Sequence, residues 1–308
     1  MVGVPLAGTR VPANLTLHLH LSGLRRIPMA RDLLPLVRRA LVGRYTVERE
    51  IGRGGASRVF GALDASGRPV ALKVLHPQLA ASVAADRFLR EVRFIARLDH
   101  PHIARMVDSG EDEWLIWYVM DLVPGPTLRQ HLERARRVST SDTLRIAQDM
   151  LAALACAHAQ GIVHRDMKPE NIVLSPGGAV LLDFGIAKAV ADAGSDRLTR
   201  SGFAVGTSAY MSPEQVGGID GIDARSDLYS LACVLYECLA GRPPYDDPFE
   251  DLVLRKHQTA PVPDIREARP DTPAPLALVI TRALAKDPGE RWPDAAAMLA
   301  ALPVPTPA

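Results

Sequence analysis

One short stretch of the chain gathers residue types suited to phosphoryl transfer: His164-Arg165-Asp166-Met167-Lys168-Pro169-Glu170-Asn171. Asp166 can accept a proton, Lys168 can neutralise a phosphate group, and Asn171 can offer a carbonyl oxygen to a metal ion. Twelve positions later the triplet Asp183-Phe184-Gly185 supplies a second carboxylate. Phosphoryl transfer needs an oriented hydroxyl, neutralised charge and metal contacts. A charged, solvated loop is the alternative, and the full string together with its spacing to the triplet argues against it.

A glycine-rich turn is expected between two strands, over residues 45–51 and 58–63. Glycines let backbone amides approach phosphate oxygens because no side chain is in the way. The turn consists of Gly52, Arg53, Gly54, Gly55, Ala56 and Ser57. No Gly-Lys-Ser or Gly-Lys-Thr closes a Walker-type loop, and no helix pattern follows as a dinucleotide-binding fold requires. The sequence therefore predicts a phosphate-covering turn, with a hairpin that binds no ligand as the alternative.

The eight-residue string resembles the catalytic loop of eukaryotic-like protein kinases, and Asp183-Phe184-Gly185 resembles their metal-binding triplet. The resemblance runs from about residue 45 to about residue 302 and is nearest to the bacterial serine/threonine kinases. It implies the bilobal α+β protein kinase fold. A small β-rich N-lobe with one long helix would span residues 44–120, a hinge residues 121–125, and a larger, mainly helical C-lobe residues 126–302.

The resemblance implies a role for each polar residue of this candidate site. Asp166 would accept or orient the proton of the substrate hydroxyl, and Lys168 would neutralise the transferred γ-phosphoryl group. Asn171 and Asp183 would hold two Mg²⁺ ions, or Mn²⁺ in their place, against the phosphates of ATP. The implied enzyme is a serine/threonine protein kinase that phosphorylates hydroxyl groups of protein substrates.

The string Val70-Ala71-Leu72-Lys73, in a strand expected over residues 69–75, resembles the Val-Ala-Ile-Lys strand of the family. A lysine that faces inward from an apolar strand is costly unless it is paired. The resemblance implies an ion pair between Lys73 and Glu91, in a helix expected over residues 84–98. This pair would hold the lysine on the α- and β-phosphates of the nucleotide.

An adenine pocket is implied by the same resemblance. Its residues would be Ile51, Val59 and Ala71 above the base, Val173 below it, Met120 at the back, and backbone groups from Asp121 to Val123 at the edge. The apolar members read equally well as ordinary core. Ser57 stands where the family motif Gly-x-Gly-x-x-Gly has its last glycine, and this departure bears on how tightly the turn covers the phosphates.

The segment after the triplet is expected to be regulatory. Lys168, together with Gly206-Thr207 ahead of Ser212-Pro213-Glu214, resembles serine/threonine rather than tyrosine kinases, with Thr207 on a shelf for the protein substrate. We hypothesise autophosphorylation at Thr199, Ser201 or both, because phosphate there could order the loop through charge-assisted bonds to Arg165. The alternative is that Arg165 pairs with a carboxylate and the loop needs no modification.

Three further residues are expected to have structural roles. Glu214 and Arg291 match positions that form a buried ion pair in the family. Asp227 lies near the start of a helix expected over residues 223–240, which is apolar nearly all round and so belongs in the middle of a lobe. We expect Asp227 to bond to the backbone of the catalytic loop.

Both ends of the chain are expected to lie outside the catalytic domain. Residues 1–43 are basic and read as a poorly ordered extension, and the natural start could be Met29, which would leave residues 1–28 outside the native protein. His18 and His20 could bind a metal, but without further ligands a disordered segment is the simpler reading. Residues 303–308 form a short proline-rich tail.

Composition limits the setting and the partners. The formal net charge of +1 gives no global electrostatic case for nucleic acid. No segment reaches the roughly 18 to 20 consecutive apolar residues of a membrane span. Cys156, Cys233 and Cys238 lack zinc-type spacing and read as reduced thiols, which favours a cytoplasmic protein. Dimerisation through the smaller lobe occurs in the family, but no feature of this sequence argues for it.

Two other functions compete with an active protein kinase. A pseudokinase scaffold usually lacks one of the catalytic lysine, aspartate or asparagine positions, whereas the chain has the full set: Lys73, Glu91, Asp166, Asn171 and Asp183. A small-molecule kinase of related fold generally lacks the substrate-shelf segment that ends at Glu214.

Overall fold

The computed structural model of the chain describes residues 33–54, 57–75, 85–112, 115–184, 207–218 and 221–304, with the backbone alone for 85–89 and 207. All described residues belong to one compact unit, Asp32–Ala308. Several predictions concern residues outside these ranges: those for Gly55, Ala56, Thr199, Ser201, the two N-terminal histidines and segment 1–28.

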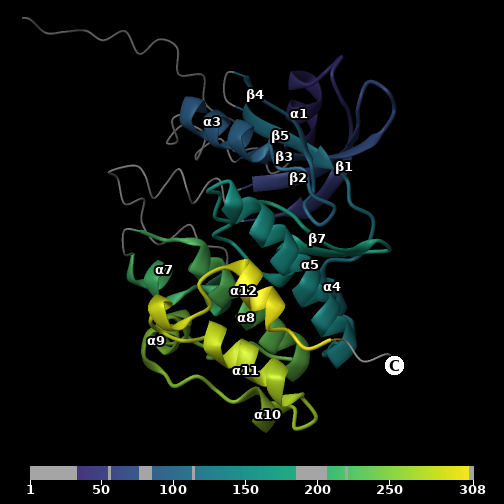
Figure 1. Ribbon diagram of the computed structural model, residues 1–308. Coiled ribbons are helices and arrows are strands. Elements are labelled where there is room, and N and C mark those ends of the chain that lie inside the picture. Colours follow the sequence, from purple (N-terminus) through teal and green to yellow (C-terminus); the bar gives the residue numbers. More distant parts are fainter. Residues whose placement is uncertain are drawn as a thin grey trace, which may run out of the picture. The chain divides into compact units, whose positions relative to one another are not determined.

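A five-stranded antiparallel sheet forms the first lobe (Figure 1). Its strands are β1 (Thr46–Arg53), β2 (Ser57–Leu63), β3 (Pro69–Leu75), β4 (Met106–Asp112) and β5 (Leu115–Asp121), in the order β1-β2-β3-β5-β4. Successive side chains point to opposite faces of a strand. Val70, Leu72 and Val74 therefore belong to one buried cluster, while Ala71 belongs to another on the opposite face together with Met120.

Helix α3 (Ala85–Ile95) provides two buried residues, Val92 and Ile95, to the cluster that contains Ala71. It also contacts β4. Strand β4 was not predicted because its sequence, Met-Val-Asp-Ser-Gly-Glu-Asp, lacks an apolar run. It lies at the edge of the sheet, where one side of the backbone has no neighbouring strand and polar residues are common.

Helix α1 (Leu34–Ala40) covers the other face of the sheet. The prediction of a poorly ordered extension over residues 1–43 is therefore wrong for residues 33–43. Leu33, Val37 and Leu41 are buried in one cluster with the sheet residues Leu72 and Trp117. Their spacing of four places them on one side of a helix. The arginines of this segment favour a charged extension when the sequence alone is considered. In the structure Arg38 and Arg39 lie on the exposed faces of a packed helix.

The second lobe is built from helices around α8. They are α4 (Leu128–Ala135), α5 (Thr140–Ala159), α7 (Pro213–Gly217), α8 (Ala224–Ala240), α9 (Glu250–Thr259), α10 (Ile265–Ala268), α11 (Ala274–Ala283) and α12 (Ala295–Ala300). Helix α8 is buried along nearly its whole length and contacts α5, α10, α11 and α12. None of the helices within the described ranges has the length and apolar content needed to cross a membrane.

A two-stranded hairpin, β6 (Ile172–Ser175) and β7 (Gly178–Leu181), connects the lobes to the candidate site. Leu181 pairs with Ile103, which follows α3 in the first lobe, and Val173 pairs with Thr127 at the start of α4. Gly125 has a φ of 131°, and a Cβ atom there would lie 2.2 Å from the carbonyl oxygen of Leu174. Glycine is therefore needed where the chain leaves β5 and passes this hairpin.

Glu214 and Arg291 join α7 to the segment before α12. Arg291 Nη1 and Nη2 donate to the two carboxylate oxygens of Glu214 at 2.7 and 2.8 Å. The side chain of Arg291 has no exposed surface, and it also donates to the carbonyl oxygens of Ala285 and Lys286. Burial alone would raise the pKa of Glu214, but the bonds from Arg291 and Ser226 hold that pKa below its usual value.

Replacing Arg291 by alanine should lower the free energy of unfolding by about 3–5 kcal/mol, because the carboxylate of Glu214 would be left buried without its partner. Urea unfolding at pH 7 measures this loss. Since the pKa of Glu214 is lowered in the folded state, the pair stabilises the protein at neutral pH and loses that effect as pH falls through the folded-state value. The deficit of the variant should therefore shrink in acid.

Arg266→Ala is the matched control, because Arg266 forms a 2.9 Å ion pair with Asp264 and both side chains are largely exposed. Exposed pairs contribute little. An equal loss of stability in the two variants would contradict the assignment of a special role to the buried pair.

Candidate active site

The backbone of the catalytic loop is held by one buried carboxylate on α8. Asp227 is 1% exposed, and its two oxygens accept hydrogen bonds from the amides of His164, at 2.7 Å, and Arg165, at 2.8 Å. His158 Nε2, on α5, lies 2.8 Å from the same carboxylate. Arg165 has a φ of 65°, in the left-handed region that is costly for a residue with a side chain. The bonds to Asp227 stabilise this turn of the chain.

Asp166, Lys168 and Asn171 converge just beyond that turn. Lys168 Nζ lies 2.8 Å from Asp166 Oδ2. Asn171 Nδ2 donates to the same oxygen at 3.1 Å and to the backbone carbonyl of Asp166 at 2.7 Å. A carboxylate, an ammonium and an amide thus form one connected group whose members come from within six residues of the chain.

His164 connects this group to the segment that leads into Asp183. Its Nδ1 accepts from the amide of Asp166 at 3.2 Å, so Nε2 carries the proton and donates to the carbonyl of Leu182 at 2.9 Å. Its ring lies 4.8 Å from that of Phe184, measured between centroids. Burial lowers the pKa of His164, which favours the neutral imidazole that this arrangement requires.

Asp183 lies at the same end of the β6–β7 hairpin as Asn171, because the amide of Leu182 donates to the carbonyl of Asn171 at 2.8 Å. Two side chains of the first lobe reach its carboxylate. Lys73 Nζ lies 2.9 Å from Oδ2, and Tyr118 Oη donates to Oδ1 at 2.9 Å. The sequence string around Asp166 and the triplet that begins with Asp183 are therefore part of one site.

The expected ion pair between Lys73 and Glu91 is replaced in the structure by the pair between Lys73 and Asp183. Within the described residues no ion pair joins Lys73 to Glu91. A partly buried ammonium needs a carboxylate partner. Lys73 lies directly opposite Tyr118 in the register of β3 and β5, and the hydroxyl of Tyr118 binds the carboxylate that Lys73 contacts.

Most of the residues predicted to contact adenine lie on neighbouring strands of the first lobe. Ala71 and Met120 are opposite each other on β3 and β5 and are both buried, as is Val173 on β6. Val59 packs against this cluster, whereas Ile51 is 39% exposed. The apolar character of these residues agrees with the lining that an adenine pocket requires.

The glycine-rich turn and the predicted hinge are held by a backbone bond and by side-chain ion pairs. The amide of Gly54 donates to the carbonyl of Ser57 at 2.9 Å, which closes the turn, and the guanidinium of Arg53 lies 2.7 Å from the carboxylate of Glu50. At the hinge, the carboxylate of Asp121 lies 3.3 Å from the guanidinium of Arg68 and 3.4 Å from that of Arg105. Gly52 and Val123 are partly exposed.

A second, partly buried polar cluster lies beside the catalytic loop and was not predicted. Arg129 on α4 donates to Glu170 of the loop at 2.8 Å and to Glu237 of α8 at 2.8 Å, and it also bonds to the hydroxyl of Tyr210. Tyr210 in turn donates to Glu237 at 2.5 Å. Only Glu170 lies within the catalytic string, and the 108-residue separation of Arg129 from Glu237 left no local signal in the sequence.

The segment predicted to form a substrate shelf begins beside this cluster. The backbone of Thr207–Tyr210 forms a 3-10 turn, which places the main chain of Thr207 next to Tyr210, while the side chain of Thr207 lies outside the description. Gln215 Nε2 on α7 donates to the carbonyl of Arg165 at 2.9 Å. The shelf and the catalytic loop are thus directly connected.

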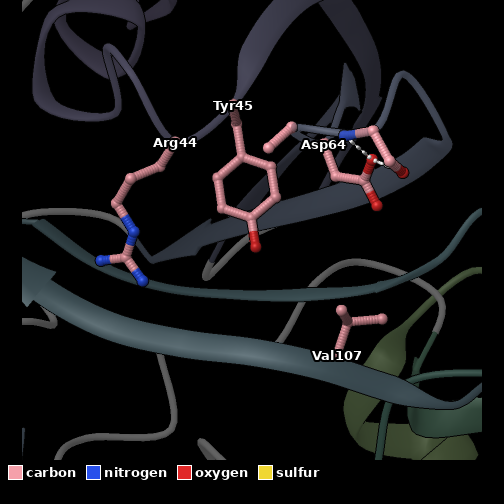
Figure 2. Close-up of a pocket in the computed structure, with 6 residues that line it drawn as sticks. Arg44, Tyr45, Asp64 and Val107 are labelled. Carbon is pink, nitrogen blue, oxygen red and sulfur yellow. Dashed lines mark hydrogen bonds between the residues drawn. The ribbon is translucent and has the colours of Figure 1, made fainter.

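A pocket of about 390 Å³ lies in the first lobe, between the chain before β1 and the β2–β3 turn (Figure 2). Its lining consists of Arg44, Tyr45, Asp64, Ala65, Ser66 and Val107. The polar groups are engaged: Asp64 accepts from the amide of Ser66 at 2.9 Å, and Arg44 and Tyr45 both bond to Asp108. None of the residues predicted for catalysis or nucleotide binding lines it.

Comparison with known proteins points to one family. The family model described as "Protein kinase domain" matches residues 45–301. The chain is 39% identical over 266 residues to the probable serine/threonine-protein kinase SCO3848 of Streptomyces coelicolor, which is 83% of this chain and 39% of that protein. It is 42% identical over 270 residues to the serine/threonine-protein kinase PknB of Mycolicibacterium smegmatis, which is 85% of this chain and 43% of that protein.

A third relative, the serine/threonine-protein kinase PknD of Mycobacterium tuberculosis, is 40% identical over 257 residues, or 82% of this chain and 38% of that protein. The chain spans about two fifths of the length of these curated relatives. The sheet lobe, the helical lobe and the matched family model confirm the predicted bilobal α+β fold. The chain belongs to the protein kinase domain family, in its bacterial Hanks-type branch.

Proposed function

We propose that the chain is an ATP-dependent serine/threonine protein kinase, which transfers the γ-phosphoryl group of ATP to hydroxyl groups of proteins. One observation carries this proposal: Asp166, Lys168 and Asn171 are in mutual contact, and Asp183 lies at the same end of the β6–β7 hairpin. The names of the relatives, all serine/threonine-protein kinases, support the substrate class. Residues 121–125 would form the hinge, between the end of β5 and the start of α4.

In the proposed mechanism Asp166 accepts or orients the proton of the acceptor hydroxyl. Its Oδ2 already accepts bonds from Lys168 and Asn171, so its orientation is fixed before the substrate binds. The ammonium of Lys168 neutralises charge on the transferred group. Lys73 reaches the same space from β3 and would contact the α- and β-phosphates once it leaves Asp183.

Asn171 and Asp183 fit a divalent metal ion. Asn171 Nδ2 is engaged with Asp166, which leaves its carbonyl oxygen as a ligand, and the carboxylate of Asp183 already contacts one cation, the ammonium of Lys73. Magnesium takes oxygen ligands, usually one or two from the protein with the rest from phosphates and water, and manganese accepts the same donors. A bound metal would supply charge neutralisation on the phosphates.

The same observations favour an active kinase over a pseudokinase scaffold. The catalytic positions are present and paired. Lys73 contacts Asp183, and Asp166 contacts both Lys168 and Asn171. The shelf that ends at Glu214 favours a protein substrate over a small molecule. A cytoplasmic setting stays a prediction, consistent with the buried free thiols of Cys233 and Cys238, and dimerisation remains without a supporting contact in the described residues.

Removing the proposed proton acceptor or the proposed metal ligand should abolish phosphate transfer. Asp166→Ala and Asp183→Ala are each expected to lower kcat by about a hundredfold or more, since one well-aimed charge stabiliser is worth about 3 kcal/mol in the barrier. Transfer from radiolabelled ATP to a generic basic protein, with magnesium, measures the change. Asp108→Asn, which removes a carboxylate bonded to Arg44 and Tyr45 outside the site, is the control. Retained activity in purified Asp166→Ala protein would refute the assignment.

We also propose that activation involves autophosphorylation at Thr199, Ser201 or both. Arg165 supports this proposal by its place beside Asp166, where Asp227 and Gln215 hold its backbone, because its guanidinium could bond to a phosphorylated loop. Phosphorylation adds close to two negative charges and can order a loop in this way.

Peptide mapping after incubation with ATP should find phosphate on Thr199 or Ser201 in the wild-type protein and none in the Asp166→Ala variant, which controls for contaminating kinases. The double variant Thr199→Ala, Ser201→Ala should lose activity by about tenfold or more, equivalent to about 1.4 kcal/mol. Fully active protein with both hydroxyls unmodified would contradict the proposal.

A further inference from the structure

Tyr118 is a polar residue inside the most deeply buried strand of the sheet. It lies in the middle of β5, between Trp117 and Val119, and only 3% of its surface is exposed. A hydroxyl group buried among apolar residues costs free energy unless it has a partner. The partner is the carboxylate of Asp183, 65 residues further along the chain. The hydroxyl therefore points into the site proposed for the nucleotide phosphates and the metal.

The two oxygens of Asp183 are held by two different donors. Tyr118 Oη donates to Oδ1 and Lys73 Nζ contacts Oδ2, both at 2.9 Å. Lys73 and Tyr118 are direct neighbours across β3 and β5, and the ammonium lies 5.7 Å from the centroid of the phenol ring. The donors are thus placed relative to each other by the register of the sheet, and together they contact both oxygens of the carboxylate.

Asp183 needs such support. Its φ of 47° is in the left-handed region, which is sparsely populated by residues with a side chain and persists only when the surroundings fix it. Lys73 is required for phosphate contacts in the proposed mechanism, so it has to leave Asp183 when a nucleotide binds. Tyr118 has no such competing role, and its bond to Oδ1 can remain while the other lone pairs of the carboxylate bind a cation.

We infer that Tyr118 is a positioning residue, whose hydroxyl holds the Asp183 carboxylate in the orientation that binds the metal and the nucleotide phosphates. This inference depends on the proposed function, because it takes Asp183 to be the metal ligand. Hydrogen-bond partners of metal ligands typically contribute a factor of about 10 to 100 in metal affinity or activity. The predicted role of Tyr118 is of this kind.

The test compares Tyr118→Phe with wild-type protein in binding a non-hydrolysable ATP analogue, by calorimetry, over a series of free Mg²⁺ concentrations. The Mg²⁺ concentration for half-maximal binding should rise by about 10- to 100-fold in Tyr118→Phe. Binding of the analogue in EDTA should stay within about twofold of wild type, since the adenine pocket is unaltered. An unchanged or lower Mg²⁺ requirement would overturn the inference, as would an equal loss of binding in EDTA, which indicates a packing role.

Tyr45→Phe is the matched control. Tyr45 also donates its hydroxyl to an aspartate, Asp108, at 2.8 Å, but it lines the pocket of Figure 2, outside the candidate site. It should leave the Mg²⁺ requirement at the wild-type value. A rise in this variant equal to that of Tyr118→Phe would overturn the inference, because loss of any such bond would then have the same effect.

Two further variants complete the test. Tyr118→Met keeps a large, flexible apolar side chain and replaces Tyr118→Phe if that protein does not fold; failure of both to fold would assign Tyr118 to packing and overturn the inference. Asp183→Asn should abolish the Mg²⁺ dependence of binding, and Tyr118→Phe should then have no additional effect. If wild-type binding does not depend on Mg²⁺ or on Asp183, the proposed function itself fails. If it does, and Tyr118→Phe equals wild type, only the role of Tyr118 fails.

Discussion

The position of the catalytic loop depends on a single buried carboxylate. Asp227 extends from the most deeply buried helix of the second lobe and binds two consecutive backbone amides, which stabilises the left-handed conformation of Arg165. Asp166 follows directly in the chain, so the helical core fixes where its carboxylate lies. His164 connects the loop to the segment around Asp183, because its ring bonds to the carbonyl of Leu182 and lies against the ring of Phe184. The core of one lobe thus fixes the geometry of the site through backbone bonds.

The first lobe completes the site by a different means. Its sheet provides Lys73 and Tyr118 at opposed positions of two neighbouring strands, and strand register fixes both donors at once. A slip of one residue would turn both side chains to the face covered by α1. The large apolar residues Leu72 and Val74, buried on that face, oppose such a slip.

Patterns of consecutive residues predicted the helices and strands whose bounds depend mainly on neighbouring residues in the chain. Strand β3 occupies residues 69–75, where a strand is expected, and α8 lies within the range 223–240 predicted from a sequence that is apolar nearly all round. Tertiary contacts determine the rest. The polar strand β4 pairs along the edge of β5, and Lys73 contacts Asp183, whose other carboxylate oxygen accepts from Tyr118 on the neighbouring strand. Neither relation has a signature in consecutive residues.

Helix α1 has a consequence for where this domain can be cut. The family model begins at residue 45, after the helix ends, yet Leu33, Val37 and Leu41 cover one face of the sheet. A fragment that begins at the family boundary would expose a continuous apolar surface that includes Trp117. Surfaces of this kind promote aggregation. A fragment that keeps this face of the sheet covered therefore has to begin upstream of the region that defines its family.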